Sequence, residues 1–163
     1  MSASPATSQS VRYRERLTVP WWWWPPAFGL AALIALEVNQ AARGLPGWVS
    51  FAALFAVAAS VLIWLGRVEV RVTGDADGAA VLWAGPAHLP ADVVSRSATV
   101  PQSAKSAALG RQLDPAAFVL HRPWVGPMVL LVLDDPEDPT PYWLVSSRRP
   151  ERVLAALAQS PTD

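Results

Sequence analysis

Two long apolar segments near the N-terminus constrain the fold of this chain more than any other feature. Residues 21–38 and 48–65 hold 18 residues each, and a short polar stretch over 39–47 connects them. Roughly 17–25 apolar residues in a helix can cross about 30 Å of hydrocarbon. Backbone groups in lipid must satisfy one another, so a helix is the only plausible state there. The two segments therefore predict a two-helix transmembrane hairpin over residues 21–65.

Composition narrows the remaining possibilities. Apolar residues make up 52% of the 163-residue chain and charged residues 16%, which is below the proportion of roughly 25% usual for soluble proteins. Thirteen basic and thirteen acidic side chains cancel, so we expect no nucleic-acid partner. The chain has no cysteine, which excludes disulfides, thiolate catalysis and cysteine-based metal sites.

Basic residues flank the open end of the predicted hairpin. Residues 1–20 are expected to form a disordered, basic N-terminal segment, although a positive region before an apolar one also fits a signal peptide. The positive-inside rule then predicts a multi-pass protein of the plasma (cell) membrane with both termini in the cytoplasm. The arginines concerned are Arg12, Arg14 and Arg16 before the hairpin and Arg67 and Arg71 after it, with Arg43 in the connecting loop.

Tryptophan is concentrated at the ends of the two apolar segments. Its ring favours the headgroup level of a bilayer, where the indole N–H stays hydrated. We therefore interpret these tryptophans as interfacial anchors, and a ligand-binding aromatic cage is the alternative. They are Trp21, Trp22, Trp23, Trp24, Trp48 and Trp64.

Small residues recur every four positions on both segments, which would let two helix backbones approach closely. The predicted seam consists of Ala27, Ala31 and Ala35 on the first segment and Ala52, Ala56 and Ser60 on the second. Glu37 falls on another side of its helix. An intramembrane carboxylate suggests a contact with a partner's helix, whereas a position near the outer interface would simply leave Glu37 hydrated.

Residues 66–163 are expected to form a cytoplasmic β-rich domain. Alternating apolar and polar residues predict strands over 67–72, 79–84, 93–100, 116–120, 128–133 and 142–145, with a loop over 101–112. A final helix has Pro150 at its first position and Ser147 or Arg149 as its cap. Short strands and one closing helix predict a small barrel or curled sheet. The fold class is therefore an α+β membrane protein.

Few residues suggest chemistry. His88 and His121 lie far apart without ligand spacing, and no nucleophile or nucleotide motif occurs, so we expect no catalytic residue, cofactor or metal. Basic side chains gather at the start of the final helix, where they fit an anionic headgroup or an acidic partner. They fit a solvated surface equally well. These residues are Arg148, Arg149 and Arg152.

Three stretches together resemble a known family. They are YRERLTVPWWWW, DPAAFVLHRPWV and DPEDPTPYWLVSSRRP, and they are similar to the two-span actinobacterial membrane proteins of the domain of unknown function 3093 family. The likeness covers residues from about Val11 to Leu157. It implies a plasma-membrane protein and supplies no activity. The C-terminal part also resembles the bacterial pleckstrin-homology-like barrels, by strand pattern alone.

These observations predict a non-enzymatic membrane-anchored binding or scaffold module of unknown biochemical activity. The alternative is an accessory subunit of a membrane enzyme or transporter complex. The expected partners are the lipid bilayer and either another membrane protein or a second copy of the chain.

Overall fold

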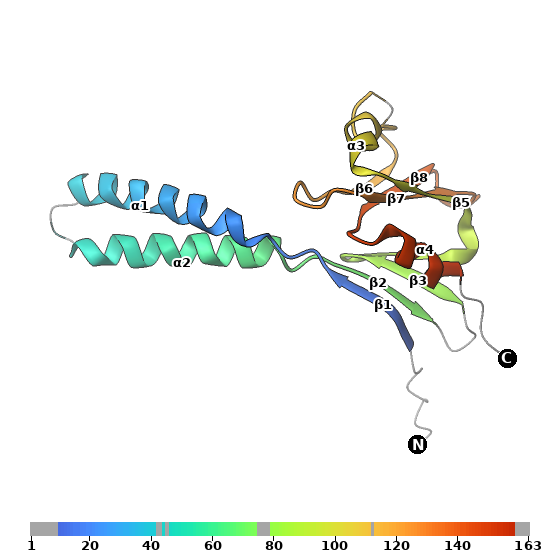
Figure 1. Cartoon of the computed structure of the whole chain (residues 1–163), viewed down its shortest axis with the longest axis horizontal. Coiled ribbons are helices and arrows are strands. Elements are labelled where there is room, and N and C mark those ends of the chain that lie inside the picture. The colour runs from blue at the N-terminus through green and yellow to red at the C-terminus, as the bar shows by residue number, and fades with distance from the viewer. Residues whose placement is uncertain (1–9, 42–43, 45, 75–78, 112, 159–163) are drawn as a thin grey trace, which may run out of the picture. The chain divides into compact units, whose positions relative to one another are not determined.

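The computed structural model describes residues 10–41, 44, 46–74, 79–111 and 113–158 (Figure 1). The chain divides into two compact units: a helical unit, residues 18–68, and a β-rich unit, residues 1–17 with 69–163. The expectations for residues 1–9 and for Arg43 lie outside the described residues.

The helical unit consists of two antiparallel helices that lie side by side. A 3-10 turn over Trp21–Trp23 leads into α1 (Trp24–Ala41), and α2 (Gly47–Leu65) follows after the connecting loop (Figure 1). Pro25 and Pro26 fall in the first turn of α1, where a missing backbone N–H removes no intrahelical hydrogen bond.

The prediction of a two-helix transmembrane hairpin is wrong. Within the described residues, only α2 is long and apolar enough to be a candidate span. The last turns of α1 contain Glu37, Asn39 and Gln40, and its first turn contains two prolines, so its apolar stretch is shorter than the helix itself. The segment over 21–38 reached 18 residues only by including the four tryptophans and two prolines before Ala27, which are less apolar than a span requires. The transmembrane description of the chain loses its support with it.

The seam between the helices was predicted correctly on α1 only. Ala31 and Ala35 are buried there, as expected. On α2 the buried residues are Ser50 and Leu62, whereas the expected seam residues Ala52, Ala56 and Ser60 are exposed. The predicted and the buried residues on α2 are two positions apart, and two positions on a helix point about 200° away from each other. Because small residues occur on several sides of α2, the sequence did not determine which side contacts α1.

One sheet of the β-rich unit, sheet A, is antiparallel with the order β1-β2-β3-β4. Its strands are β1 (Ser10–Arg16), β2 (Glu69–Gly74), β3 (Ala80–Ala84) and β4 (Ala87–Pro90). Gly85 makes the tight β3–β4 turn with a φ of 65°, which glycine adopts without strain. The sequence analysis assigned residues 10–16 to a disordered segment, and the structure places them in the sheet as the neighbour of β2.

The second sheet, sheet B, has the order β5-β7-β8-β6. A 3-10 turn over Ala91–Val93 joins the sheets, and the strands are β5 (Val94–Val100), β6 (Phe118–Leu120), β7 (Met128–Leu133) and β8 (Tyr142–Ser146). A short helix, α3 (Gln102–Ala108), occupies the stretch expected to be a loop. The pairs β5–β7 and β7–β8 are antiparallel, and β6 runs parallel to β8.

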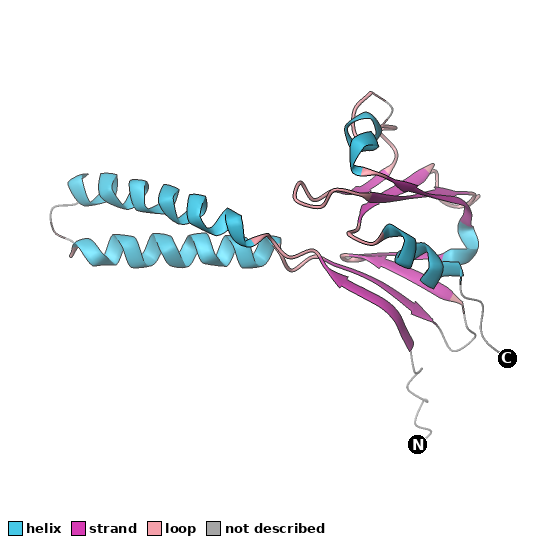
Figure 2. Ribbon diagram, in the orientation of Figure 1, coloured by secondary structure: helices cyan, strands magenta, loops and turns pink. Residues whose placement is uncertain are grey.

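The closing helix is α4 (Pro150–Ala158), which buries Pro150, Val153 and Ala156. It lies between the two sheets and contacts strands of both (Figure 2). The core of the unit forms from fully buried side chains on both sheets, among them Leu82 and Leu131. The fold is therefore α+β with eight strands in two sheets, and the prediction of a pleckstrin-homology-like barrel after a two-helix membrane hairpin is corrected to this.

Candidate functional site

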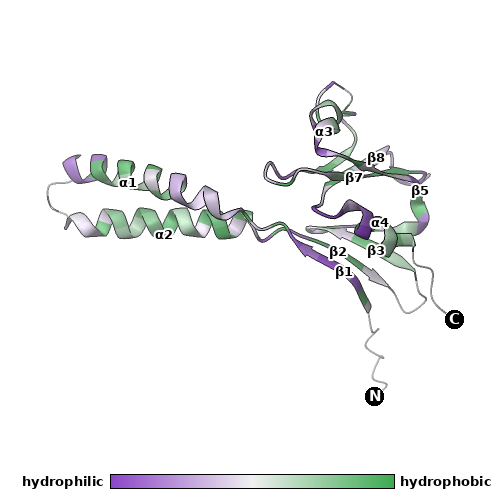
Figure 3. Ribbon diagram, in the orientation of Figure 1, coloured by the Kyte–Doolittle hydropathy of each residue, from purple (hydrophilic) through white to green (hydrophobic). Residues whose placement is uncertain are grey.

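The helical unit exposes an unusual amount of apolar surface. Leu33 is 63% exposed on α1 and Val57 is 58% exposed on α2, and only 11% of the apolar window of α2 is buried. Green hydrophobic segments dominate α2 and the middle of α1 in Figure 3. Soluble monomers rarely leave contiguous apolar patches larger than a few hundred Å². This surface is the first candidate binding site, which we call the apolar surface of the helical unit.

Tryptophans mark both ends of α2. Trp48 is the second residue of the helix and Trp64 the last but one, and they are 72% and 69% exposed. At 1.5 Å per residue, about 24 Å of helix separates them. Trp21 and Trp22 are also exposed, as interfacial anchors would be. Trp24 differs, because its ring packs on Phe28 with 5.7 Å between centroids.

Polar contacts hold the helices together near the loop. The Oγ of Ser50 donates a hydrogen bond to Oδ1 of Asn39 (2.6 Å), and Nδ2 of Asn39 donates to the carbonyl of Gly47 (3.1 Å). The Asn39–Ser50 contact was not predicted from the sequence, although a polar Asn39 in the last turn before the loop could have indicated it. Glu37 is exposed on α1, and among the described residues it has no hydrogen-bond or ion-pair partner.

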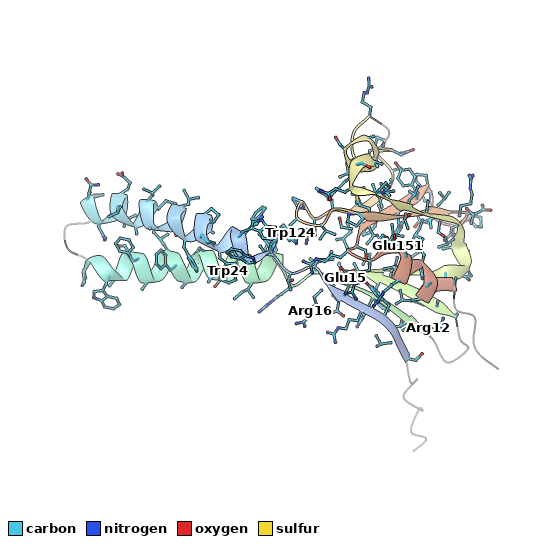
Figure 4. The ribbon with its side chains drawn as sticks, in the orientation of Figure 1. Arg12, Glu15, Arg16, Trp24, Trp124 and Glu151 are labelled. Atoms are coloured by element: carbon cyan, nitrogen blue, oxygen red, sulfur yellow. The ribbon has the colours of Figure 1, made fainter. Side chains whose placement is uncertain are left out.

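In the β-rich unit, Glu15 of β1 binds the segment that leads into α4. Its carboxylate accepts hydrogen bonds from the hydroxyls of Tyr13 and Ser147, both at 2.8 Å, and from the backbone N–H of Arg148 at 2.9 Å. Burial, followed by the hydrogen bond to Glu15 and its charge, raises the pKa of Tyr13 to about 12. Figure 4 labels Glu15 on its strand. This network explains how β1 is fastened to the rest of the unit.

The three arginines expected as a contact site are all exposed at the start of α4. The guanidinium of Arg148 donates to the carbonyl of Arg16 at 3.4 Å, so part of its hydrogen-bonding capacity is used within the unit. Arg149 is the cap, because its carbonyl accepts from the N–H groups of Arg152 and Val153. The Oγ of Ser147 accepts from the N–H of Arg149 and shapes the turn before the cap. Binding of a headgroup or partner by these arginines stays a prediction.

A second surface, which sequence reasoning missed, lies on the outer face of sheet A. Strand register aligns Arg14, Arg71, Trp83 and His88 in one row across β1 to β4. The guanidinium carbon of Arg71 lies 4.8 Å from the Trp83 ring centroid, and the His88 ring lies 5.1 Å from it. The Trp83 indole N–H donates to Oγ1 of Thr73 at 3.0 Å, which fixes the ring. The signal in the sequence was the alternation of polar residues along each strand. These residues form a row only once the register between the strands is known.

Ion pairing neutralises one end of this row. Nε of Arg14 lies 2.8 Å from a carboxylate oxygen of Glu69, and Nε of Arg16 lies 3.6 Å from the other. The hydrogen bond from Arg14, opposed by partial burial, lowers the pKa of Glu69. Arg71 and His88 are exposed and, among the described residues, have no acidic partner.

Among the described residues of the β-rich unit are two small hollows with volumes of about 170 and 210 Å³. The first lies between α4 and β5 and is lined mainly by Val94, Leu131 and Leu154. The second lies beside α3 over Leu130 and Leu144. Both are apolar and below the 300–1,000 Å³ typical of small-molecule sites. In the described parts of the chain, no three acidic or histidine side chains come close enough to hold a metal ion.

Comparison with known proteins identifies one family model that matches the chain. It is described as a protein of unknown function (DUF3093), and it matches residues 12–157. No curated protein and no solved structure matches the chain. The actinobacterial origin implied by the resemblance stays a prediction, whereas the two implied spans are not supported, because α2 alone among the described residues is a candidate span.

Proposed function

We propose that this chain, which belongs to the DUF3093 family, is a membrane-anchored binding or scaffold module. In this proposal the apolar surface of the helical unit attaches the chain to lipid and the β-rich unit presents the binding surfaces. The single observation that supports it is the apolar surface of the helical unit. Its most exposed large apolar side chains are Trp21, Trp22, Leu30, Leu33, Leu36, Trp48, Val57, Ile63 and Trp64.

Lipid fits this surface better than one protein partner does. Neighbouring positions such as Leu33 and Ile34, or Ile63 and Trp64, are exposed together, and neighbours on a helix point about 100° apart. The exposed apolar residues therefore cover several sides of each helix rather than one stripe. A helix that is apolar on all sides is typical of a protein core or of lipid. A docked partner would cover one side and leave the others in water.

The strand pairing adds a constraint on the anchor. β1 precedes the helical unit and β2 follows it, and the two strands are neighbours in sheet A. Whatever part of the helical unit inserts in lipid, both of its ends must therefore lie on the same side of the membrane. We expect this side to be the cytoplasm, because basic residues flank both ends, Arg14 and Arg16 on one and Arg67 on the other.

One observation favours the accessory-subunit alternative. Tryptophan and arginine are among the residue types most enriched in the energetic centres of protein interfaces, and the row on sheet A presents both, a half-buried Trp83 and an exposed Arg71. A stoichiometric partner retained by the full chain in detergent, and lost on Trp83→Ala, would support that role.

The test of anchoring is extraction of membranes from cells that express the full chain. We expect the chain to stay in the membrane pellet through alkaline carbonate and to enter the supernatant only with detergent. Val57→Lys should reduce the pelleted fraction, because a charge in mid-membrane costs roughly 2.5–3.5 kcal/mol. Val11→Lys is the matched control, since Val11 on β1 is 59% exposed and Val57 is 58% exposed. Release of the wild-type chain by carbonate alone would refute the proposal.

A further inference from the structure

The loop between β6 and β7, residues 121–127, is held in place from two directions. The ammonium of Lys105 on α3 donates hydrogen bonds to the carbonyls of Arg122 and Val125. The Trp124 indole N–H donates to the carbonyl of Leu17 at 3.1 Å, and Leu17 is fully buried. Trp124 is labelled on this loop in Figure 4. The loop is therefore a built structure rather than a free connection.

Two cations, Lys105 of α3 and Arg122 of the loop, meet here. Among the described residues, Lys105, His121 and Arg122 have no acidic partner. Burial, and then the charges of Lys105 and Arg122, lower the pKa of His121, so the positive charge at this loop is carried by Lys105 and Arg122. Like charges held together in a half-buried place are unfavourable unless an anion joins them.

Arg122 has hydrogen-bonding capacity to spare. Its Nε is buried and has no hydrogen-bond partner, and Nη1 donates only to the neighbouring carbonyl of His121 at 3.3 Å. Its guanidinium carbon lies 5.9 Å from the Trp124 ring centroid, which limits where the group can point. Lys105 uses two of its three protons on carbonyls and keeps the third. A guanidinium fork and an ammonium proton are the donors that bind phosphate.

The covalent chain connects this loop to the start of the helical unit. Leu17, which accepts from Trp124, is four residues before Trp21, so the two residues are at most about 14 Å apart along an extended chain. If the helical unit is anchored in lipid, the loop lies within reach of the headgroups.

We propose that Arg122, Lys105 and Trp124 form a binding site for the phosphate group of an anionic lipid headgroup. The guanidinium of Arg122 donates hydrogen bonds to two phosphate oxygens, and the remaining N–H of the Lys105 ammonium donates to another phosphate oxygen. Trp124 holds the loop against the end of β1. This inference rests on the proposed membrane anchoring, and it adds the class of lipid that the anchored chain would select.

The test is native mass spectrometry of the full chain in non-ionic detergent, with phosphatidylglycerol, phosphatidylcholine or inorganic phosphate added. We expect wild type to retain phosphatidylglycerol in preference to phosphatidylcholine. Arg122→Gln should reduce retention of phosphatidylglycerol about fivefold, the effect of roughly one surface charge. Excess inorganic phosphate should not displace the lipid. Displacement at matched ionic strength would overturn the lipid assignment in favour of free phosphate.

A second pair of variants keeps the test independent of folding around Arg122. Pro123 is exposed in the same loop, so Pro123→Glu and Pro123→Gln make the same backbone change and differ in one charge. We expect Pro123→Glu to reduce phosphatidylglycerol retention and Pro123→Gln to retain more of it. Equal retention by these two variants would overturn the site. Carbonate extraction separates this result from failure of the anchor, because all variants should stay with the membrane even if the site is refuted.

Discussion

Replacing Glu15 by alanine should destabilise the β-rich unit more than any other single charge removal on sheet A. The substitution deletes the acceptor for the hydroxyls of Tyr13 and Ser147 and for the backbone N–H of Arg148. These contacts join β1 to the turn before α4, which is 132 residues away in the sequence at Ser147. Glu15 therefore closes the unit by a long-range contact that local structure does not replace.

The size of the effect follows from the three hydrogen bonds. A hydrogen bond to a charged group contributes roughly 1.5–3 kcal/mol. The three share one carboxylate and are not additive, and the site is half-buried, so water recovers part of the loss. We expect Glu15→Ala to lower the free energy of unfolding by about 2–4 kcal/mol. For a unit of this size that corresponds to a fall in Tm of roughly 8–16 °C.

The assay is thermal unfolding of the full chain in non-ionic detergent, followed by the β-sheet circular-dichroism signal. Glu69→Ala is the matched control, because Glu69 lies on the neighbouring strand and its ion-pair partners, Arg14 and Arg16, are exposed side chains. Exposed pairs contribute little, so its Tm shift should be several times smaller. A Glu15→Ala shift no larger than that of Glu69→Ala would refute the reasoning. The pKa of Tyr13 should also fall in Glu15→Ala, because the Glu15 hydrogen bond and charge both raise it.

Three further outcomes are expected. In Tyr142→Phe, Tyr13 is the one remaining phenol, and ultraviolet titration should give it a pKa of about 12. The stabilising effect of the neutral phenol is complete below about pH 10, its pKa in the unfolded chain, and is lost as pH rises through 12. A titration midpoint near pH 10 would contradict this. Ala35→Leu should lower the stability of the helical unit in detergent by about 1–3 kcal/mol, because Ala35 is fully buried, whereas Ala56→Leu should be nearly neutral. Equal shifts in the Tm of the two variants would instead support Ala56 as part of the seam. Ser50→Ala should cost roughly 1 kcal/mol, measured by the helical circular-dichroism melt, and no change would show that water replaces its bond to Asn39.

Local pattern in the sequence was enough for several elements. The strand expected over 128–133 is β7 with the same bounds, and the closing helix begins at Pro150 as expected. The motifs quoted for the family resemblance lie within the matched residues 12–157. A buried strand with continuous apolar residues, or a helix with proline at its first position, encodes its state within a few residues.

Other features depend on partners distant in the sequence. Residues 10–16 contain three arginines and a glutamate and show no apolar alternation. They form β1 because β2, which follows the helical unit in the sequence, supplies their hydrogen-bond partners. The row around Trp83 and the network around Glu15 exist only once the strand register is set. On α2, alanine on several sides left the seam ambiguous, and packing against α1 selected Ser50 and Leu62. Composition and periodicity specify what a segment can bury, whereas pairing and packing decide what it does bury, because those energies arise between segments.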